Sequence, residues 1–280
     1  MQISRKLLHK PNKFINKFVN NGYLPNRLTN LFGNNHIKYD TIHKTFYETV
    51  DGNKVFLQRP RDPVGLFKDG SSHLEKLCSQ VYFSHYTPKK NEVYIDIGAG
   101  YGHESIWLAM HNQGVIIHNI EANPIVYSHL CKSTEKFSNI QNYNLVISKE
   151  DVLSLPFSSD YISVDSHNDK NPIKINGISL DDFLKKSNIK YIDLLKMNIE
   201  GAEIDVMQNI NDFSKIKRFV ISCHDFRANN GEGEFFRTKD RVIAILKENG
   251  FTIQNMDSEW YNGEFLTDTW LNDWIYAEKV

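Results

Sequence analysis

The sequence predicts an α/β protein built on a mostly parallel sheet of seven strands, preceded by a smaller α/β extension. From residue 91 onward, short runs rich in β-branched and aromatic residues alternate with amphipathic segments, which is the pattern of repeated strand–helix–strand units. A glycine-rich turn follows the first of these runs, where a buried strand passes into a helix. The 280 residues are 40% hydrophobic and 24% charged, a composition that excludes extended disorder.

The elements of the domain over residues 91–280 follow from these runs in order. Strands are predicted at residues 93–97, 115–120, 140–147, 191–197, 216–224, 251–256 and 273–279. Helices are predicted at residues 102–111, 124–137, 179–186, 202–210 and 238–249. Ser179 is a typical helix N-cap, and Gly250 is a typical residue after a helix end. The segment 151–178 interrupts the alternation, and its Ser158-Ser159-Asp160 turn predicts an inserted hairpin.

Residues 46–90 form the predicted lead-in to this domain. The dipeptide Asp51-Gly52 lies between two alternating runs and predicts a β-hairpin over residues 46–60. A helix is predicted over residues 71–85, with an apolar face that consists of Leu74, Leu77, Val81 and Tyr82.

Residues 1–45 form a predicted basic arm with a net charge of +7, which leaves −8 on the rest of the chain. Apolar residues recur in the arm at roughly helical spacing, interrupted by Pro11: Leu7, Leu8, Phe14, Ile15, Phe18 and Val19. Two interpretations stay open. Either this stripe packs on the body or on a second subunit of a homo-oligomer, or residues 1–20 lie on a membrane surface. A nucleic-acid partner is not expected, because the acidic body repels phosphates.

The chain lacks the apolar run of roughly 18 residues that a spanning helix needs, and its first thirty residues lack the apolar core of a secretory signal. A cytoplasmic location is therefore expected, with the inner face of the membrane as the alternative for the arm. The three cysteines, Cys78, Cys131 and Cys223, form no CxxC pair and are expected to be buried thiols.

The glycine turn in VYIDIGAGYGHES, residues 93–105, is the first candidate binding site. Glycines at alternate positions allow a sharp turn and close approach to a ligand, and the free amides of the following helix face that ligand. The dinucleotide fingerprint needs a glycine where this chain has His103, which disfavours NAD. An acid before the turn can bind the amino group of S-adenosylmethionine. The predicted residues for this part of the cofactor are Asp96, Gly98, Ala99, Gly100, Gly102 and Glu104.

The end of the next strand supplies a second carboxylate. Glu121 follows the glycines by about 20 residues, the separation at which an acid binds both hydroxyls of a ribose. Ala122 and Asn123 continue this segment into the next helix. The adenine ring is predicted to lie against the end of the third strand, at Val146, Ile147 and Ser148.

At these motifs the chain resembles the FkbM-type methyltransferases over roughly residues 80–256. The similarity lies in YTPKKNEVYIDIGAGYGHES, IEANP, the SLDDFL helix, YIDLLKMNIEGAEIDVM, and HDF followed by RTKDRVIAILKENGF, in the family's order. LLKMNIEGAE is the most specific piece. The resemblance implies a Rossmann-like class I methyltransferase fold with a seven-stranded sheet, S-adenosylmethionine as the donor, and O-methylation of a hydroxyl on a sugar, polysaccharide or polyketide. Many members have Asp at the position of Asn198.

The ends of the fourth and fifth strands carry the candidate catalytic residues. Carboxyl ends of parallel strands form the ligand crevice, so these side chains should face the methyl donor. His224 is the predicted base, because methyl transfer to an alcohol needs a proton acceptor and histidine titrates near neutrality. Glu200 or Asp225 orients it, or Glu200 is itself the base. Lys196 is a fourth candidate, unless it only pairs with Glu200 or Glu203.

Three further hypotheses concern a metal site, a lid and an aromatic segment. Glu200, Asp225 and Asn198 could hold a divalent metal that acidifies the acceptor hydroxyl. The loop 227–236 has the glycine content of a lid over the acceptor. Aromatic residues near the carboxyl end stack on a sugar ring or pack in the core: Trp260, Tyr261, Phe265 and Trp270.

These observations together predict a methyltransferase that uses S-adenosylmethionine and acts on a hydroxyl of a sugar or glycoconjugate. A polyketide or peptide natural product is the alternative acceptor. A protein that binds S-adenosylmethionine without catalysis is the second alternative, in which Asn198 marks a lost site.

Overall fold

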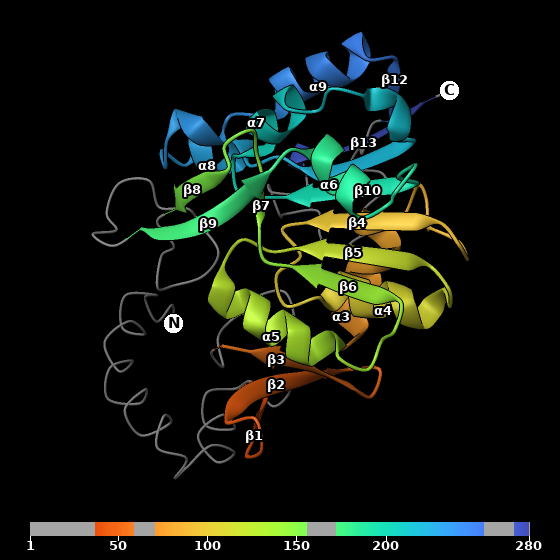
Figure 1. Ribbon diagram of the computed structural model, residues 1–280, viewed down its shortest axis with the longest axis vertical. Coiled ribbons are helices and arrows are strands. Elements are labelled where there is room, and N and C mark those ends of the chain that lie inside the picture. The colour runs from red at the N-terminus through yellow and green to blue at the C-terminus, as the bar shows by residue number, and fades with distance from the viewer. Residues whose placement is uncertain (1–36, 59–70, 156–171, 255–271, 280) are drawn as a thin grey trace, which may run out of the picture.

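A computed structural model describes residues 37–58, 71–155, 172–254 and 272–279 (Figure 1). Several predicted features lie outside these ranges: the basic arm up to residue 36, including residues 1–20, the turn at residues 158–160, and Trp260, Tyr261, Phe265 and Trp270.

A seven-stranded sheet forms the centre of the protein, with the order β12-β13-β11-β10-β4-β5-β6 (Figure 1). Its strands are β4 (Val93–Ile97), β5 (Ile116–Ile120), β6 (Ile140–Tyr143), β10 (Leu194–Asn198), β11 (Arg218–Ser222), β12 (Phe251–Gln254) and β13 (Trp274–Lys279). Only β13 runs antiparallel to its neighbours in this sheet. Strands β5 and β6 follow β4 on one side of it, and β10 then pairs with β4 on its other side. The pair β4–β10 is therefore the topological switch point, where α/β sheets bind ligands.

Helices cover both faces of this sheet. They are α3 (Ser71–Leu77), α4 (His103–His111), α5 (Pro124–Thr134), α6 (Leu180–Lys186), α7 (Glu203–Gln208), α8 (Asp225–Asn229) and α9 (Lys239–Glu248). Apolar side chains of α3, α4 and α5 belong to one buried cluster, and those of α6, α7 and α9 belong to another. Successive residues of β4 point to opposite clusters, since Tyr94 belongs to the first and Ile95 to the second. The predicted seven-stranded α/β fold is confirmed.

Two predicted elements are wrong in extent. The strand predicted at 140–147 ends at Tyr143. The side-chain amide of Asn144 donates hydrogen bonds to the carbonyl oxygens of Glu121 and Ala122 (2.8 and 2.9 Å), and the chain turns there. The following β7 (Val146–Ile147) instead joins a small sheet with β9 (Ile173–Ile178) and β8 (Val152–Leu155). The helix predicted at 71–85 changes after α3 into a π-helical turn, Cys78–Tyr82.

A three-stranded antiparallel sheet precedes the main domain and consists of β1 (Lys38–Asp40), β2 (Thr45–Val50) and β3 (Asn53–Leu57). Figure 1 shows it next to α5. The Thr45 hydroxyl lies 3.1 Å from Nε2 of His129, and the Phe56 amide donates to the Ser133 hydroxyl (2.8 Å). Glu48 also pairs with His103, the first residue of α4. These contacts attach the small sheet to the helices that follow the glycine turn.

Of the cysteines, Cys78 and Cys223 are buried as predicted, whereas Cys131 is only half-buried, and all three are free thiols. Within the described ranges, none of the helices has both the length and the apolar character needed to cross a membrane.

We expect Phe219→Ala to lower the free energy of unfolding by about 3–5 kcal/mol, because Phe219 is fully buried and its ring lies 5.2 Å from that of Phe251. Chemical denaturation measures this change. The control Ile42→Ala, at a side chain that is 84% exposed, should stay within about 0.5 kcal/mol of the wild type. Similar losses in the two variants would contradict the assigned core.

Candidate active site

A cavity of about 530 Å³ lies at the carboxyl ends of β4, β5 and β10, at the switch point of the sheet. Its walls come from the glycine turn, the segment after β5, the small sheet, α7 and the loop before α9. Residues that line it include Ile97, Gly98, Glu121, Ala122, Val146, Ile147, Ser148, Leu153, Asn198, Ile199, Ala202, Asp205 and Phe235. Six of the predicted cofactor residues therefore border the same cavity: Gly98, Glu121, Ala122, Val146, Ile147 and Ser148.

The glycine turn fits closely against β10. Gly98 has φ +80°, and a Cβ atom there would lie 2.2 Å from the carbonyl oxygen of Asn198. A side chain is thus excluded both by backbone conformation and by space. The amides of Gly98 and Ala99 donate to the carbonyl oxygen of Ile120 (2.9 and 3.2 Å), which fixes the turn to the end of β5. Gly102, also at positive φ, precedes the first residue of α4.

Lys196 lies beneath this turn, not on the acceptor side. Its ammonium group is fully buried, lies 2.7 Å from Oδ1 of Asp96 and donates to the carbonyl oxygen of Gly98 (3.0 Å). Although burial lowers the pKa of Lys196, the adjacent Asp96 raises it above its ordinary value, so the ammonium form is retained. The alternative pairing of Lys196 with Glu200 or Glu203 is therefore wrong, and its position beneath the turn does not support the predicted catalytic role. Asp96, also fully buried, is bound to Lys196.

Glu121 is held at the cavity wall by backbone groups. Its two carboxylate oxygens accept hydrogen bonds from the amides of Gly100 (2.9 Å) and Asn123 (2.8 Å). Burial raises the pKa of Glu121 to about 7, while these two donors act in the opposite direction. Its remaining lone pairs are available to the hydroxyl donors of a ribose. A buried carboxylate beside a turn that excludes a Cβ atom fits S-adenosylmethionine.

Two other predicted cofactor residues have structural contacts. The side chain of Asn123 accepts hydrogen bonds from the amides of Ile125 and Val126 and so caps α5. Glu104 lies in the first turn of α4, beside the buried hydroxyl of Tyr82, whose pKa is raised by burial and by Glu104.

An alternating row of charged groups follows the ends of β10 and β11. Its members do not line the cavity, but Ile199 and Ala202, on either side of Glu200 in the sequence, do. His224 is buried, with Nε2 3.4 Å from Oε1 of Glu200 and Nδ1 3.2 Å from Oε1 of Glu203. Burial by itself lowers the pKa of His224, but the two carboxylates outweigh this effect and raise it to about 9. At neutral pH the imidazole is therefore a cation. This opposes its predicted role as a free base.

Glu200 is the most accessible member of this row, with 24% of its side chain exposed. It has φ +56°, an uncommon conformation for a residue other than glycine, and it precedes Gly201 at φ +101°. Arg227 donates to its Oε2 at 2.5 Å. Burial raises the pKa of Glu200, yet His224 and Arg227 together lower it below its ordinary value. Glu200 is thus an ionised carboxylate in a strained and oriented position.

Asp225 does not orient His224. Its Oδ1 atom accepts hydrogen bonds from the amides of Thr238 (2.9 Å) and Lys239 (3.0 Å) at the start of α9. Glu203 takes the orienting position instead. Because Glu200 pairs with Arg227 and Asp225 caps a helix, these residues do not fit the predicted metal site. In the described part of the chain, the one cluster of metal-ligating side chains is exposed and far along the sequence from them: Asp51, Glu75 and His111.

The predicted lid over residues 227–236 contains the end of α8 and a 3₁₀ turn, Glu234–Phe236. Arg227 connects its parts, since it pairs with Glu232 (2.8 Å) and lies 3.9 Å from the centre of the Phe236 ring. Glu203 was predicted only as a possible partner of Lys196, and Arg227 was not predicted. No local spacing indicates either residue, because Glu200 precedes α7 at positive φ and the contacts of both residues join distant segments.

Comparison with known proteins shows the family. The profile of the methyltransferase FkbM domain matches residues 96–253. No curated protein matches the chain.

Solved structures give weaker likenesses. They include a precorrin-6y C5,15-methyltransferase from Geobacter metallireducens (14% identity, 78% of this chain and 91% of that chain, TM-score 0.42). Fibrillarin from Aeropyrum pernix with bound S-adenosyl-L-methionine has 14% identity, 69% and 67% coverage, and a TM-score of 0.36. A TehB-like methyltransferase from Corynebacterium glutamicum has 15% identity, 68% and 80% coverage, and a TM-score of 0.38.

The sheet order, the glycine turn and Glu121 define a class I methyltransferase that depends on S-adenosylmethionine. Within this class, the chain belongs to the FkbM methyltransferase family. The alternative of a binding protein without catalysis is set aside.

The pKa of His224 predicts a pH dependence of stability. Because the folded value of about 9 lies above the ordinary 6.5, the stabilisation is complete below pH 6.5 and is lost as pH rises through 9. The loss is on the order of 3 kcal/mol. Denaturation across this range should show it in the wild type and in a His111→Gln control. His224→Gln should flatten the curve, and an unchanged slope in that variant would refute the assignment.

Proposed function

We propose that this enzyme transfers the methyl group of S-adenosylmethionine to a hydroxyl of a sugar or glycoconjugate. The observation that carries the proposal is the ionised Glu200 carboxylate, oriented by Arg227 and His224 in the segment whose Ile199 and Ala202 line the cavity at the switch point. The proposed donor site lies on the side of Glu121, and the proposed acceptor site lies on the side of Glu200 and Phe235.

The chain's own residues define the donor half. When bound, S-adenosylmethionine supplies an electrophilic methyl group on a sulfonium ion. Glu121 accepts hydrogen bonds from the ribose hydroxyls, and the apolar side chains of Val146, Ile147 and Leu153 receive the adenine ring. The glycine turn permits close approach of the backbone, since Gly98 carries no side chain.

In the acceptor half, Glu200 takes the hydroxyl proton. A carboxylate with a lowered pKa is a weak base, but the hydroxyl becomes strongly acidic once its oxygen begins to bond to the methyl carbon. The cationic groups of His224 and Arg227 keep Glu200 ionised at neutral pH and hold it in place. In this proposal Glu200 acts as the base and His224 as its positioning residue.

Phe235 supports a carbohydrate acceptor. Its ring is 49% exposed although it lines the cavity, and it lies over Gly201, where a Cβ atom would come within 2.6 Å of the ring. Phe236 packs edge-on against it, with 5.5 Å between ring centroids. An exposed aromatic face near a carboxylate suits a sugar, which has both an apolar ring face and hydroxyl groups.

Glu200→Gln should lower kcat by about 100-fold or more, since it removes the proton acceptor, and should leave S-adenosylhomocysteine binding unchanged. The assay measures methylated product by mass spectrometry after incubation with a panel of mono- and oligosaccharides. Glu232→Gln is the matched control, because Glu232 also pairs with Arg227 but is more exposed. Equal activity of the two variants would refute the role of Glu200. Product formed only from a parallel panel of polyketides and peptides would refute the carbohydrate acceptor.

Phe235→Ala should raise KM for the saccharide about tenfold while kcat and S-adenosylhomocysteine affinity change little, because in this proposal the ring contacts the acceptor and not the methyl donor. Phe235→Trp should restore the wild-type KM. Ile42→Ala, at an exposed apolar residue away from this cavity, serves as the control. An unchanged KM for Phe235→Ala would contradict this role.

A further inference from the structure

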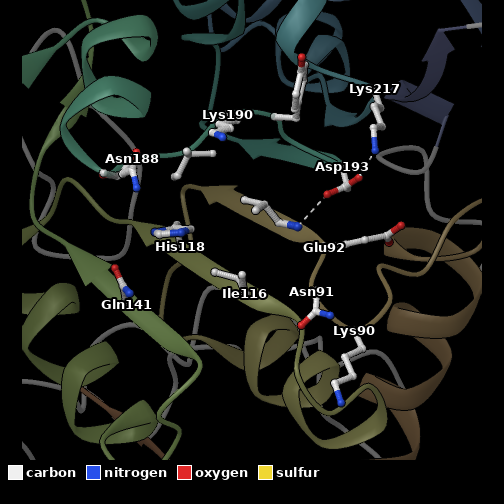
Figure 2. A pocket seen from close by; sticks show the side chains of 14 residues that line it. Lys90, Asn91, Glu92, Ile116, His118, Gln141, Asn188, Lys190, Asp193 and Lys217 are labelled. Atoms are coloured by element: carbon white, nitrogen blue, oxygen red, sulfur yellow. Dashed lines mark hydrogen bonds and ion pairs between the residues drawn. The ribbon is translucent and has the colours of Figure 1, made fainter.

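A second cavity, of about 560 Å³, lies at the opposite edge of the sheet, at the amino ends of β4, β5 and β10 (Figure 2). β5 separates it from the proposed active site, because Ile116 begins this strand on one side and Glu121 follows it on the other. Five residues of strand extend over about 15 Å. The side chains that line the second cavity include Lys90, Glu92, Ile116, His118, Gln141, Asn188, Lys190, Tyr191, Asp193 and Lys217.

His118 supplies a buried hydrogen-bond acceptor at the floor of this cavity. The residue is only 3% exposed, and its Nδ1 atom lies 3.1 Å from the Tyr143 hydroxyl oxygen. The Tyr143 hydroxyl donates its own proton to Oε1 of Gln141 (2.7 Å), so Nδ1 of His118 is the donor in the first bond. Burial lowers the pKa of His118 to about 4, which keeps the ring neutral. The lone pair on Nε2 therefore has no proton, and no described residue donates to it.

The charges around His118 do not balance. Asp193 pairs with Lys217 (2.6 Å) and accepts the amide of Val93 (2.9 Å). Glu92 accepts hydrogen bonds from the Tyr86 hydroxyl and the Lys89 amide. Lys217 thus neutralises Asp193, whereas Glu92 is held by uncharged donors and keeps its negative charge.

Two ammonium groups remain. Lys90 and Lys190 make no ion pair with any residue in the described ranges. Figure 2 shows them on either side of Ile116, with His118 beside it. Three lysines against two acids give the lining of this cavity a net charge of +1, on a body that is otherwise acidic, with a neutral acceptor at the floor.

We propose that this cavity is a second ligand site, which binds a small anionic polyol such as a sugar phosphate. The anionic group pairs with Lys90 and Lys190, and a hydroxyl donates to Nε2 of His118. The amides of Gln141 and Asn188 border the cavity and are suited to further hydroxyls. Ile116, which is exposed, and Tyr191, which is 58% exposed, offer an apolar surface to the ring face. This site is independent of the methyl-transfer reaction.

Isothermal titration of the full chain with glucose 6-phosphate, glucose and inorganic phosphate tests the proposal, with saturating S-adenosylhomocysteine present. We expect glucose 6-phosphate to bind at least tenfold more tightly than either fragment, because only it satisfies both the lysines and His118. Absence of glucose 6-phosphate binding would overturn the proposal. Binding of glucose 6-phosphate only when S-adenosylhomocysteine is left out would also overturn the proposal, since the ligand would then occupy the methyl-donor cavity.

Variants test the contact with the lysines and the contact with His118 separately. Lys90→Gln combined with Lys190→Gln should weaken glucose 6-phosphate at least tenfold. A Lys136→Gln and Lys247→Gln double variant, with the same charge change at exposed lysines elsewhere, should bind as the wild type does. His118→Phe keeps a ring against Tyr143 and should reduce the preference for glucose 6-phosphate over phosphate by about fivefold. Equal binding by both double variants, or an unchanged preference in His118→Phe, would overturn the proposal.

Discussion

The ion pair between Asp96 and Lys196 is the interaction on which the cofactor half of the site depends. Both groups are fully buried, and such charges are tolerated only when each compensates the other. The pair joins β4 to β10 at the switch point of the sheet, and Lys196 also holds the carbonyl oxygen of Gly98. The glycine turn is thereby fixed against the end of β10, and Glu121 faces the cavity from the other side.

On the proposed acceptor side, charged groups again compensate one another, but here one carboxylate stays accessible. Glu203, His224, Glu200 and Arg227 alternate in charge, so each neutralises the next in a partly dry environment. Glu200 lies between His224 and Arg227 in this row and is its most accessible member. The arrangement favours a carboxylate base held by cations over a free histidine, and it connects this base through Arg227 to the loop that carries Phe235. In the proposed function, the donor and acceptor sides meet at the end of β10.

The sequence predicted the fold because strands and helices have different hydrophobic periods, and every strand of the main sheet occurs close to its predicted position. The strand over 140–147 was too long, because a side chain–backbone contact of Asn144 ends it, and such contacts leave no periodic pattern. Cavity residues at strand ends, such as Gly98 and Glu121, were predictable from spacing. The partners of Lys196 and Asp225 were not, since ion pairs and helix caps between distant segments are decided by tertiary packing.

Titration with S-adenosylhomocysteine, comparing the wild type with Lys196→Met and with Asp96→Asn combined with Lys196→Met, tests the central role of the buried pair most directly. We expect Lys196→Met to weaken binding at least tenfold, because it leaves a buried carboxylate without its partner, and the double variant to recover part of this loss. Wild-type affinity in Lys196→Met would contradict the central role of the buried pair.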